Sequence, residues 1–438
     1  MSQSSAMHMA ALLPINGRKR RLNDATASAP APARRVKLSD RPEGSAKGPP
    51  SQADIWYYPP DIANDMQSVP LPRSVVEETL ACSWEYTRSI IPHFTNWPRY
   101  IAFCRIICMG ILAEVHGHLV DIMKSDEALG YNVQEQLDIL FHGTAGYDAM
   151  CREYRAFLLI SSDKCSKRRD AELFRRYVNS LASSAKTWFR LRDCDALARF
   201  TMAAALRCND FDDVWFSEDE WQVLAEIGDA LYDAVAFYKH RAEGETNSTF
   251  AYVGDDEFRT ETFRRCREVL WALDVAWARD PARRCVLNFL RPFGGPIHLT
   301  MRRYRFVEDG LAIGKAETED VVNRTRKHFK LWHRVDANET YAEDEKRYKD
   351  AVTRESYLLF EGMADILEAN GHGRCNNCEY RLSYGAQTIG CFGGAELCGN
   401  CKDDWKKYME SLPERASKAF PALRPIIPKF EANDTKLK

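Results

Sequence analysis

Several common features are missing from this chain of 438 residues. There is no strong net charge, because 61 basic and 63 acidic side chains leave a formal charge of −2, which offers no overall field for nucleic acid. There is no long, purely apolar run either. The longest one, residues 101–119, carries Arg105, Glu114 and two histidines and is too polar and too short to span a bilayer. With no secretory signal, we expect a soluble protein without a membrane span.

Sustained strand-like alternation and internal repeats are also missing between Pro72 and about Asn370. Apolar residues there recur at the spacing of an amphipathic helix, and glycine and proline separate the periodic segments. We therefore predict an all-α domain over residues 53–370. The predicted helices are 72–91, 97–123, 132–140, 145–163, 168–183, 185–208, 217–242, 255–278, 281–290, 295–308, 315–334 and 341–369.

Cysteine is not scarce, since the chain has 14. Most are scattered singly through apolar helical patterns, which favours buried thiols in a reducing compartment over a disulfide scaffold. Two C-x-x-C pairs at the end differ, because each knuckle can aim two thiolates at one metal ion. These pairs predict a structural Zn²⁺ site in a small module over residues 371–425, before a tail of residues 426–438. The four predicted ligands are Cys375, Cys378, Cys398 and Cys401.

The second knuckle and the residues after it are similar to a GATA-type finger. In such fingers basic residues contact phosphates and apolar ones read the major groove. Here the spacer between the knuckles is longer, and the following helix contains Asp403 and Asp404. We therefore prefer a structural module packed on the helical domain and do not expect nucleic acid as a partner. A nuclear DNA-binding regulator is the alternative function.

Residues 1–52 are rich in Ala, Pro, Ser, Lys and Arg and have no hydrophobic period, which predicts a disordered tail. Within them, Arg18–Arg21 and Arg34–Lys37 flank a short spacer of proline and alanine. This arrangement fits a bipartite nuclear-import signal and fits a solvated basic tail equally well. We expect a cytoplasmic protein, with nuclear entry through the tail as the alternative.

The charged residues at the end of the helix predicted over 217–242 form the clearest chemical pattern. Tyr232-Asp233-x-x-Ala236-x-x-Lys239-His240, followed by Gly244, is similar to the second metal motif of class I terpene synthases, without its Asn, Ser and Glu. The resemblance implies that Asp233 binds Mg²⁺ and that Lys239 binds a diphosphate. The alternative is an ordinary charged helix end. Candidates to supply the missing oxygen ligands are Asp229, Glu243, Glu245 and Asn247.

Basic residues precede and follow this helix. Arg192 lies in a segment similar to the one that carries the diphosphate-sensing arginine of these synthases, and Arg303-Tyr304 is similar to their late Arg-Tyr pair. The planar fork of arginine matches phosphate oxygens and stays charged. Each arginine alone is more often a surface residue. The ordered series of basic segment, acidic helix and Arg-Tyr pair favours diphosphate binding.

No D-D-x-x-D occurs where such synthases have their first metal motif. Glu114 stands there, late in the apolar helix predicted over 97–123, with His118 and Asp121 at i+4 and i+7 on the same face. A carboxylate on an apolar helix needs a partner or an ion. We predict that these three residues bind Mg²⁺ and that Glu78 adds a further catalytic carboxylate. The alternative is a pairing of Glu114 with Arg105 or another arginine.

Longer stretches resemble one family, the fungal α-ionylideneethane synthases, over roughly Trp56 to Leu423. This small, atypical group of sesquiterpene synthases opens the fungal abscisic acid pathway. The resemblance implies a class I terpene synthase-like bundle, farnesyl diphosphate as substrate, Mg²⁺ dependence and a hydrocarbon or alcohol product. For this reaction we predict Glu114, Asp233 and Glu78 as catalytic residues. Because the group also makes other skeletons, the product does not follow, and the oligomeric state stays open. The similar stretches are Trp56–Asp65, Trp84–Arg88, Arg192–Phe200, Tyr232–Tyr252 and Phe293–Phe306.

Overall fold

The structure is a computed structural model that describes residues 57–181, 183–295, 297, 318–320, 344–369, 375–380 and 392–427. The predicted tail of residues 1–52 lies outside these ranges. The predicted helices 295–308 and 315–334 also lie outside them, except for a few residues. All the elements below belong to one compact unit, Pro49–Lys438.

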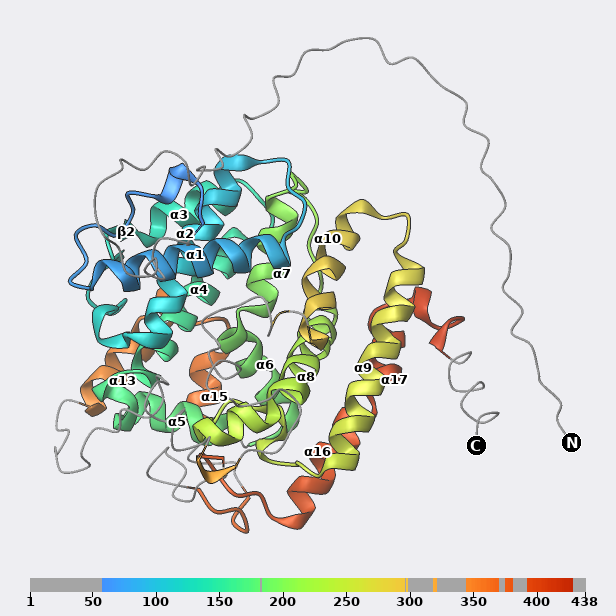
Figure 1. The fold of residues 1–438 in the computed structure, drawn as a ribbon. Helices are drawn as coiled ribbons and strands as arrows, with labels where there is room; N and C mark the ends of the chain where they lie inside the picture. Colours follow the sequence, from blue (N-terminus) through green and yellow to red (C-terminus); the bar gives the residue numbers. More distant parts are fainter. Residues whose placement is uncertain are drawn as a thin grey trace, which may run out of the picture. The chain divides into compact units, whose positions relative to one another are not determined.

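The first part of this unit is a group of helices around an almost wholly apolar one (Figure 1). That central helix begins after Asn96, whose side chain accepts a hydrogen bond from the Arg99 N–H, and Pro98 suits its first turn. A short hairpin, β1 (Glu127–Ala128) with β2 (Tyr131–Asn132), connects two of the helices and turns at Leu129 and Gly130, both with positive φ. The helices are α1 (Arg73–Ile90), α2 (Trp97–Val115), α3 (Val133–Phe141) and α4 (Tyr147–Lys164), with short 3-10 turns η3 (Pro60–Ile62) and η4 (Gly117–Leu119).

The middle of the chain contributes α5 (Glu172–Leu181), α6 (Ala185–Ala196), α7 (Ala198–Arg207) and α8 (Glu218–Glu243), with η5 (Lys167–Asp170) before α5. One helix was predicted over 185–208, but Leu197 has φ 53° and breaks it into α6 and α7. This left-handed conformation is costly for a residue other than glycine, so surrounding contacts must hold it. Leu197 is buried, and the break turns the backbone beside the cavity described below.

The last part contains η6 (Thr249–Ala251), α9 (Asp256–Ala276), α10 (Pro281–Leu290) and η7 (Arg291–Gly294), then α13 (Asp344–Thr353), α14 (Glu355–Leu358) and α15 (Met363–Ala369). The chain ends with α16 (Gly399–Glu410), α17 (Leu412–Ala419) and η9 (Pro421–Leu423). Figure 1 shows α17 beside α9, and the ring of Phe420 packs on Trp277 with centroids 5.1 Å apart. The terminal helices are therefore part of the main core.

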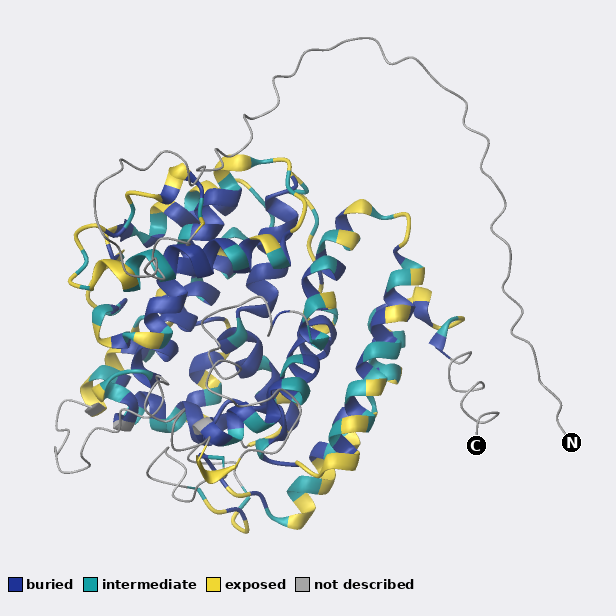
Figure 2. Cartoon of the chain, in the orientation of Figure 1, coloured by how far each residue is buried: buried dark blue, intermediate teal, exposed yellow. Residues whose placement is uncertain are grey.

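Buried residues fill the centre of this helical assembly, and exposed ones lie on its outer faces (Figure 2). The prediction of a mostly helical protein is confirmed for the described residues, and most helix ends lie within a few residues of the predicted ones. Besides the helix broken at Leu197, two predicted helices were too long, because 97–123 stops at Val115 and 341–369 is divided into three. Among the described residues, no helix combines the length and apolar content needed to cross a bilayer.

Candidate active site

A cavity lies among α1, α2, α4, α6, α8, the chain after α8 and η7. One part of its wall is apolar and aromatic: Tyr86, Ile107, Ile111, Phe157, Leu197, Tyr232, Phe293 and Ile297. Another part is charged and polar: Glu114, Lys164, Arg192, Asp195, Asp229, Lys239, His240, Glu245 and Asn247. The open space inside is about 90 Å³. An apolar wall with a dense polar group beside it is typical of a binding site for a small molecule.

Helix α8 supplies much of the polar wall, and both of its ends are well defined. Ser217 and Glu220 form a capping box at its start. At its end Gly244 has φ 64° and reverses the chain, as a C-cap glycine does. Residues 244–255, which we call the α8–α9 loop, therefore bring Glu245 and Asn247 back to the cavity.

Arg192 of α6 is the best-fixed cation of this wall. Its guanidinium donates to Asp233 of α8 over 2.9 Å and 3.3 Å and to Asp195 over 2.9 Å. Asp233 also accepts hydrogen bonds from the N–H and the hydroxyl of Thr249, over 2.6 Å and 2.7 Å. Burial opposes the charge of Arg192, but Asp233 and Asp195 outweigh it and raise the pKa of Arg192. The guanidinium is therefore charged and held in one orientation.

A second buried cation, Lys164 at the end of α4, shares the carboxylate of Asp195. Its Nζ lies 2.8 Å from Asp195 Oδ1, and both side chains are almost fully buried. Burial opposes the charge of Lys164, but Asp195 and Glu245 raise the pKa of the lysine. Burial likewise opposes the charge of Asp195, but Lys164 and Arg192 lower the pKa of its carboxyl. The two cations and Asp195 thus form one charged network beside the cavity.

Asp229 lies one helical turn before Asp233 and has a different environment. It lines the cavity, it is 2% exposed, and its Oδ2 has no hydrogen-bond partner. Burial raises the pKa of the Asp229 carboxyl well above its usual range, and the nearby Arg192 offsets this only in part. An unpaired buried carboxylate is costly, so this oxygen needs a proton or a cation.

The predicted ligands of the first metal site are separated in the structure. Glu114 lines the cavity from the last turn of α2. The helix ends at Val115, so the expectation that His118 and Asp121 share a helix face with Glu114 was wrong. His118 is exposed in η4, and Asp121 pairs with Arg347 over 3.1 Å in a different pocket. Neither of these two residues lines the cavity.

Other predicted residues also have definite places. Lys239 lines the cavity. Glu78 is half-buried on α1 and is not part of the cavity wall, and Arg105 pairs with Asp65 over 2.8 Å. Arg303, Tyr304 and the side chain of Glu243 lie outside the described residues.

Sequence reasoning missed Lys164, Asp195 and Thr249. Asp195 follows Arg192 at i+3, a spacing at which helical side chains meet, so this pair had a recognisable signal. Lys164 and Thr249 had no such signal. Lys164 is 31 residues from its partner Asp195, and Thr249 is 16 residues from its partner Asp233. Such contacts depend on how the helices pack.

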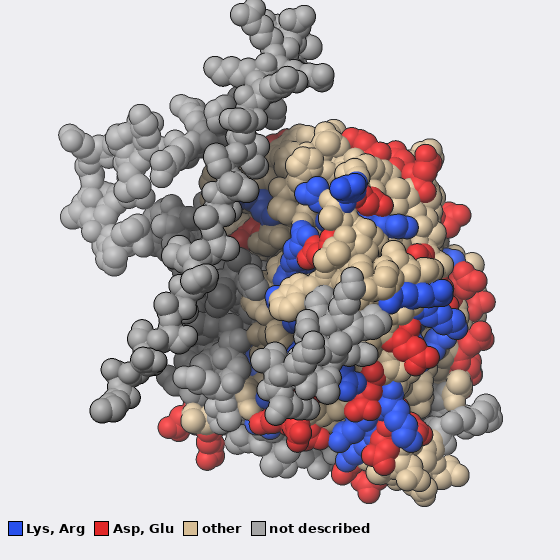
Figure 3. All heavy atoms as spheres, turned by 90° about the vertical axis from the view of Figure 1, so that its right-hand side faces the viewer, with Lys and Arg blue, Asp and Glu red and all other residues tan. Residues whose placement is uncertain are grey.

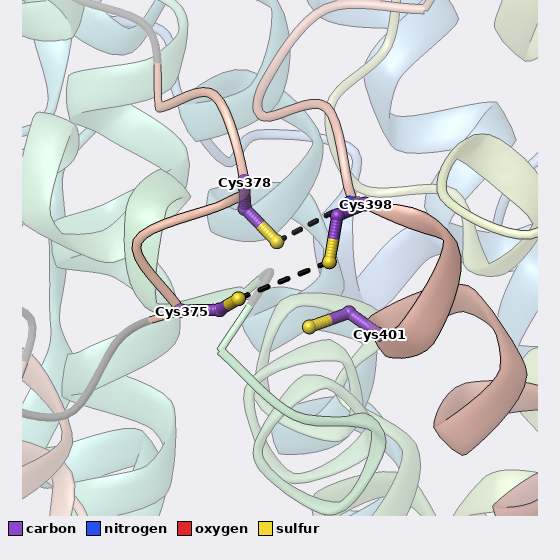
Figure 4. A group of neighbouring side chains, drawn as sticks. All are labelled: Cys375, Cys378, Cys398 and Cys401. Atoms are coloured by element: carbon purple, nitrogen blue, oxygen red, sulfur yellow. Dashed lines mark hydrogen bonds between the residues drawn. The ribbon is translucent and has the colours of Figure 1, made fainter.

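The four predicted thiols gather at the start of α16 (Figure 4). Their sulfur atoms all lie within 4.8 Å of one another, and Cys375 Sγ is 3.8 Å from Cys398 Sγ. The backbone N–H of Cys401 is the main cause that lowers the pKa of the Cys398 thiol to about 7. The 13 described cysteines are all free thiols, so the four are available as ligands. This donor set fits a thiolate-binding metal such as zinc.

Helix α16 is packed against the helical core. Trp405 and Met409 of this helix are buried, and Tyr408 donates to the buried Glu226 of α8 over 2.5 Å. Figure 3 shows basic and acidic side chains interspersed among the described residues of the face it presents. A helix that reads DNA needs a free surface with a positive field. These observations do not favour the alternative of a GATA-like regulator.

A helical protein with a cavity that is apolar on one side and charged on the other is suited to bind a small molecule. Comparison with known proteins identifies its group, because residues 54–422 match the family model described as alpha-ionylideneethane synthase aba3. The chain therefore belongs to the alpha-ionylideneethane synthase family, a family of enzymes. This confirms the family predicted from the similar stretches of sequence.

Individual relatives agree. The chain is 60% identical over 371 residues to an alpha-ionylideneethane synthase of Botryotinia fuckeliana. The aligned residues make up 85% of this chain and 84% of the relative. It is 58% identical to one of Leptosphaeria maculans, over 85% of this chain and 87% of the relative. It is 48% identical to one of Pyricularia oryzae, over 85% and 84% of the two chains. The family match, over residues 54–422, spans both the cavity and the four cysteines.

Proposed function

We propose that this chain is a sesquiterpene synthase that converts farnesyl diphosphate to α-ionylideneethane or a closely related sesquiterpene. In a fungus with the abscisic acid pathway, that product would enter abscisic acid biosynthesis. The observation that carries the proposal is the buried guanidinium of Arg192, fixed by Asp233 and Asp195 in the charged part of a cavity whose other part is apolar and aromatic. The family relationship supports the same reaction.

The charged wall suits a diphosphate together with divalent cations. Arg192, Lys164 and Lys239 are cations, but Glu114, Asp229 and Glu245 face the same space. A diphosphate alone would be repelled by these carboxylates. Mg²⁺ prefers oxygen ligands and, when bound, neutralises charge that develops on the leaving diphosphate. We assign Glu114 and Asp229 as its principal protein ligands, with Glu245 as a further candidate.

Asp233 fits a different role from the metal binding that its motif predicted. Its two oxygens already accept hydrogen bonds from Arg192 and Thr249, it is fully buried, and it does not line the cavity. We therefore assign Asp233 to the positioning of Arg192. Because Arg192 stays charged and oriented, it stabilises the diphosphate without reorganising during the reaction.

The reaction begins when the allylic carbon–oxygen bond of farnesyl diphosphate breaks and the diphosphate leaves with the electron pair. The remaining cation must be kept from water and stabilised by π faces. Tyr86, Phe157, Tyr232 and Phe293 supply aromatic rings to the wall. Loss of a proton, with or without reprotonation and ring closure, then gives a neutral hydrocarbon.

Substrate binding must enlarge the cavity. Sites for small ligands usually enclose about 300–1,000 Å³, whereas the open space here is about 90 Å³. The backbone break at Leu197, the α8–α9 loop and the turn η7 are parts of the wall that lie outside the α-helices. We propose that the backbone at Leu197 shifts as the farnesyl chain enters.

We further propose that the four-cysteine cluster binds Zn²⁺ in a structural role. Four thiolates leave no open position for a substrate, which is the pattern of structural zinc sites. None of the four cysteines lines the cavity.

The test is incubation of the purified protein with farnesyl diphosphate and Mg²⁺, followed by gas chromatography–mass spectrometry. We expect a sesquiterpene hydrocarbon with the mass of α-ionylideneethane, and equimolar release of inorganic diphosphate. Glu114→Ala should abolish the product. Glu135→Gln, which changes an exposed carboxylate of α3, is the control and should behave like the unaltered chain.

Unconsumed farnesyl diphosphate with the unaltered, folded chain would contradict the proposal. A gel-shift screen with random duplex DNA would then examine the zinc-finger alternative.

A further inference from the structure

The four-cysteine cluster lies outside the cavity, yet its surroundings connect it to the α8–α9 loop. Two of the thiols flank the first turn of α16, since Cys398 is the N-cap and Cys401 follows within the helix. Trp405 lies one turn after Cys401 and is 2% exposed. A metal bound by the thiols would therefore fix the start of the helix that carries Trp405.

Trp405 contacts two elements that position cavity residues, α6 and the α8–α9 loop. Its ring centroid lies 5.7 Å from that of Trp188 in α6 and 5.5 Å from that of Tyr252 in the α8–α9 loop. The Trp188 and Tyr252 rings also meet edge to face, at 5.1 Å. The three rings form one buried cluster, which we call the aromatic cluster.

A second contact joins the residues around the four cysteines to the same loop. We call residues 375–380 and 392–410, which include α16, the cysteine module. Residues Glu379 and Glu396 pair through two backbone hydrogen bonds next to the knuckles. Gly394, with φ 89°, lies so close to Tyr252 that a Cβ at this position would be 2.6 Å from the tyrosine oxygen. That hydroxyl donates to the Thr246 carbonyl over 3.1 Å. The loop is thus covered from outside by the cysteine module.

From the inside, the same loop supports the cavity. Glu245 and Asn247 line it, and Thr249 donates twice to Asp233, which holds Arg192. Trp188 of the aromatic cluster also donates to the Thr249 hydroxyl, over 3.4 Å. Three residues, Trp188, Thr249 and Asp233, therefore connect Trp405 to the guanidinium of Arg192 through successive contacts.

We propose that the metal-loaded cysteine module positions the active site, by holding the α8–α9 loop so that Thr249 and Asp233 orient Arg192. Trp405 and Tyr252 are the positioning residues. Neither touches the cavity, and both act through the loop. The inference rests on the proposed function for its catalytic consequence, but the loop itself can be observed without turnover.

The first experiment compares hydrogen exchange by mass spectrometry in zinc-loaded full-length protein and in protein dialysed against 1,10-phenanthroline, both without Mg²⁺. Loops held by few contacts open locally at low cost, so we expect peptides of residues 245–252 to exchange about tenfold faster after metal removal. Peptides of α3, remote from the module, should not change. Faster exchange confined to residues 375–380 and 392–410 would overturn the proposal.

A pair of variants separates loop positioning from general stability and keeps all four thiols. Trp405→Leu removes a ring of the aromatic cluster. Tyr408→Leu makes the same kind of change on the same helix, but the side chain of Tyr408 contacts Phe189, Glu226 and Arg415, none of which belongs to the loop. Both variants should lower the melting temperature.

Only Trp405→Leu should speed exchange of residues 245–252 and weaken the binding of inorganic diphosphate with Mg²⁺, measured by calorimetry. Equal loop exchange in the two variants would overturn the proposal, whatever their activity. A chain that makes no sesquiterpene but shows the Trp405-specific change would contradict the proposed function and leave the positioning intact.

Discussion

At the scale of single residues, Asp229 and Asp233 show how packing gives two similar side chains different properties. They lie one turn apart on α8. Asp233 accepts hydrogen bonds from Arg192 and Thr249, whereas one oxygen of Asp229 has no partner and faces the cavity. Asp233 stabilises the folded chain, and Asp229 is held for a ligand at a cost in stability.

Asparagine substitution should separate these two roles. Asp233→Asn leaves the buried Arg192 with Asp195 alone, and loss of one partner of a buried ion pair costs about 3 kcal/mol. Asp229→Asn should leave the melting temperature unchanged or higher, because a neutral amide replaces an unpaired acid, while activity falls by about a hundredfold. Thermal melts and the product assay on both variants check this. A lower melting temperature for Asp229→Asn than for Asp233→Asn would contradict the assignment.

The same carboxyl gives a pH dependence with a definite sign. The folded-state pKa of Asp229 is raised above the unfolded value of about 4, so its contribution to stability is lost as the pH rises through the folded pKa. The Asp229→Asn variant has no carboxyl at this position and does not lose this stability as the pH rises. In Mg²⁺-free buffer, the melting temperature of the variant minus that of the unaltered chain should therefore increase from about pH 5 to pH 8. A difference that shrinks with pH would contradict the raised pKa.

At the scale of elements, α8 has two caps with different consequences. Ser217 forms the capping box at the start, and Gly244, with φ 64°, ends the helix and directs the α8–α9 loop. The start of the helix contributes no cavity residue before Asp229. The two ends can therefore be altered independently.

We expect Ser217→Ala and Gly244→Ala each to cost about 1 kcal/mol, one through a lost cap and the other through an unfavourable positive φ. Only Gly244→Ala should also lower kcat, because it shifts Glu245, Asn247 and Thr249. Melting temperatures and steady-state kinetics on the two variants test this. If Ser217→Ala lowered kcat as much, the loop would not be the cause.

The ends of elements also show what periodicity can and cannot predict. The apolar pattern of α2 continues past Val115, so the sequence favoured a helix to 123, and His118 and Asp121 were assigned to the face of Glu114. Gly117 explains the stop, because a Cβ there would lie 2.3 Å from the Ser162 carbonyl oxygen of α4. The glycine therefore lets the chain pass close to α4 directly after the helix has ended.

At the scale of the whole molecule, the terminal helices belong to the main core. Arg415 of α17 pairs with the buried Glu226 over 2.6 Å, and Trp405 covers Trp188. A chain that ends at Ala369 would expose the ring of Trp188 and leave Glu226 without its cation. We expect such a chain to aggregate or to lose its cooperative melt, as judged by size-exclusion chromatography and calorimetry. A monomeric fragment that melts like the full chain would show that the module is independent.

Deletion of residues 1–52 is the matching control at the other end. The cavity is lined by residues from Tyr86 onward, and the family match begins at residue 54. We expect the shortened chain to keep its melting temperature and its product within experimental error. A loss of activity would instead assign a catalytic contribution to the tail.

The sequence by itself determined the helical class, most helix positions, the four-cysteine cluster and the family, because each is encoded by local spacing or by long similar stretches. It also singled out Glu114, Arg192 and Lys239, which line the cavity. Only the tertiary structure decided that Asp233 holds Arg192, that Lys164 and Thr249 complete the network, and that Trp405 reaches the α8–α9 loop. These contacts join residues far apart in the chain, and a partner across a packed interface leaves no periodic trace in the sequence.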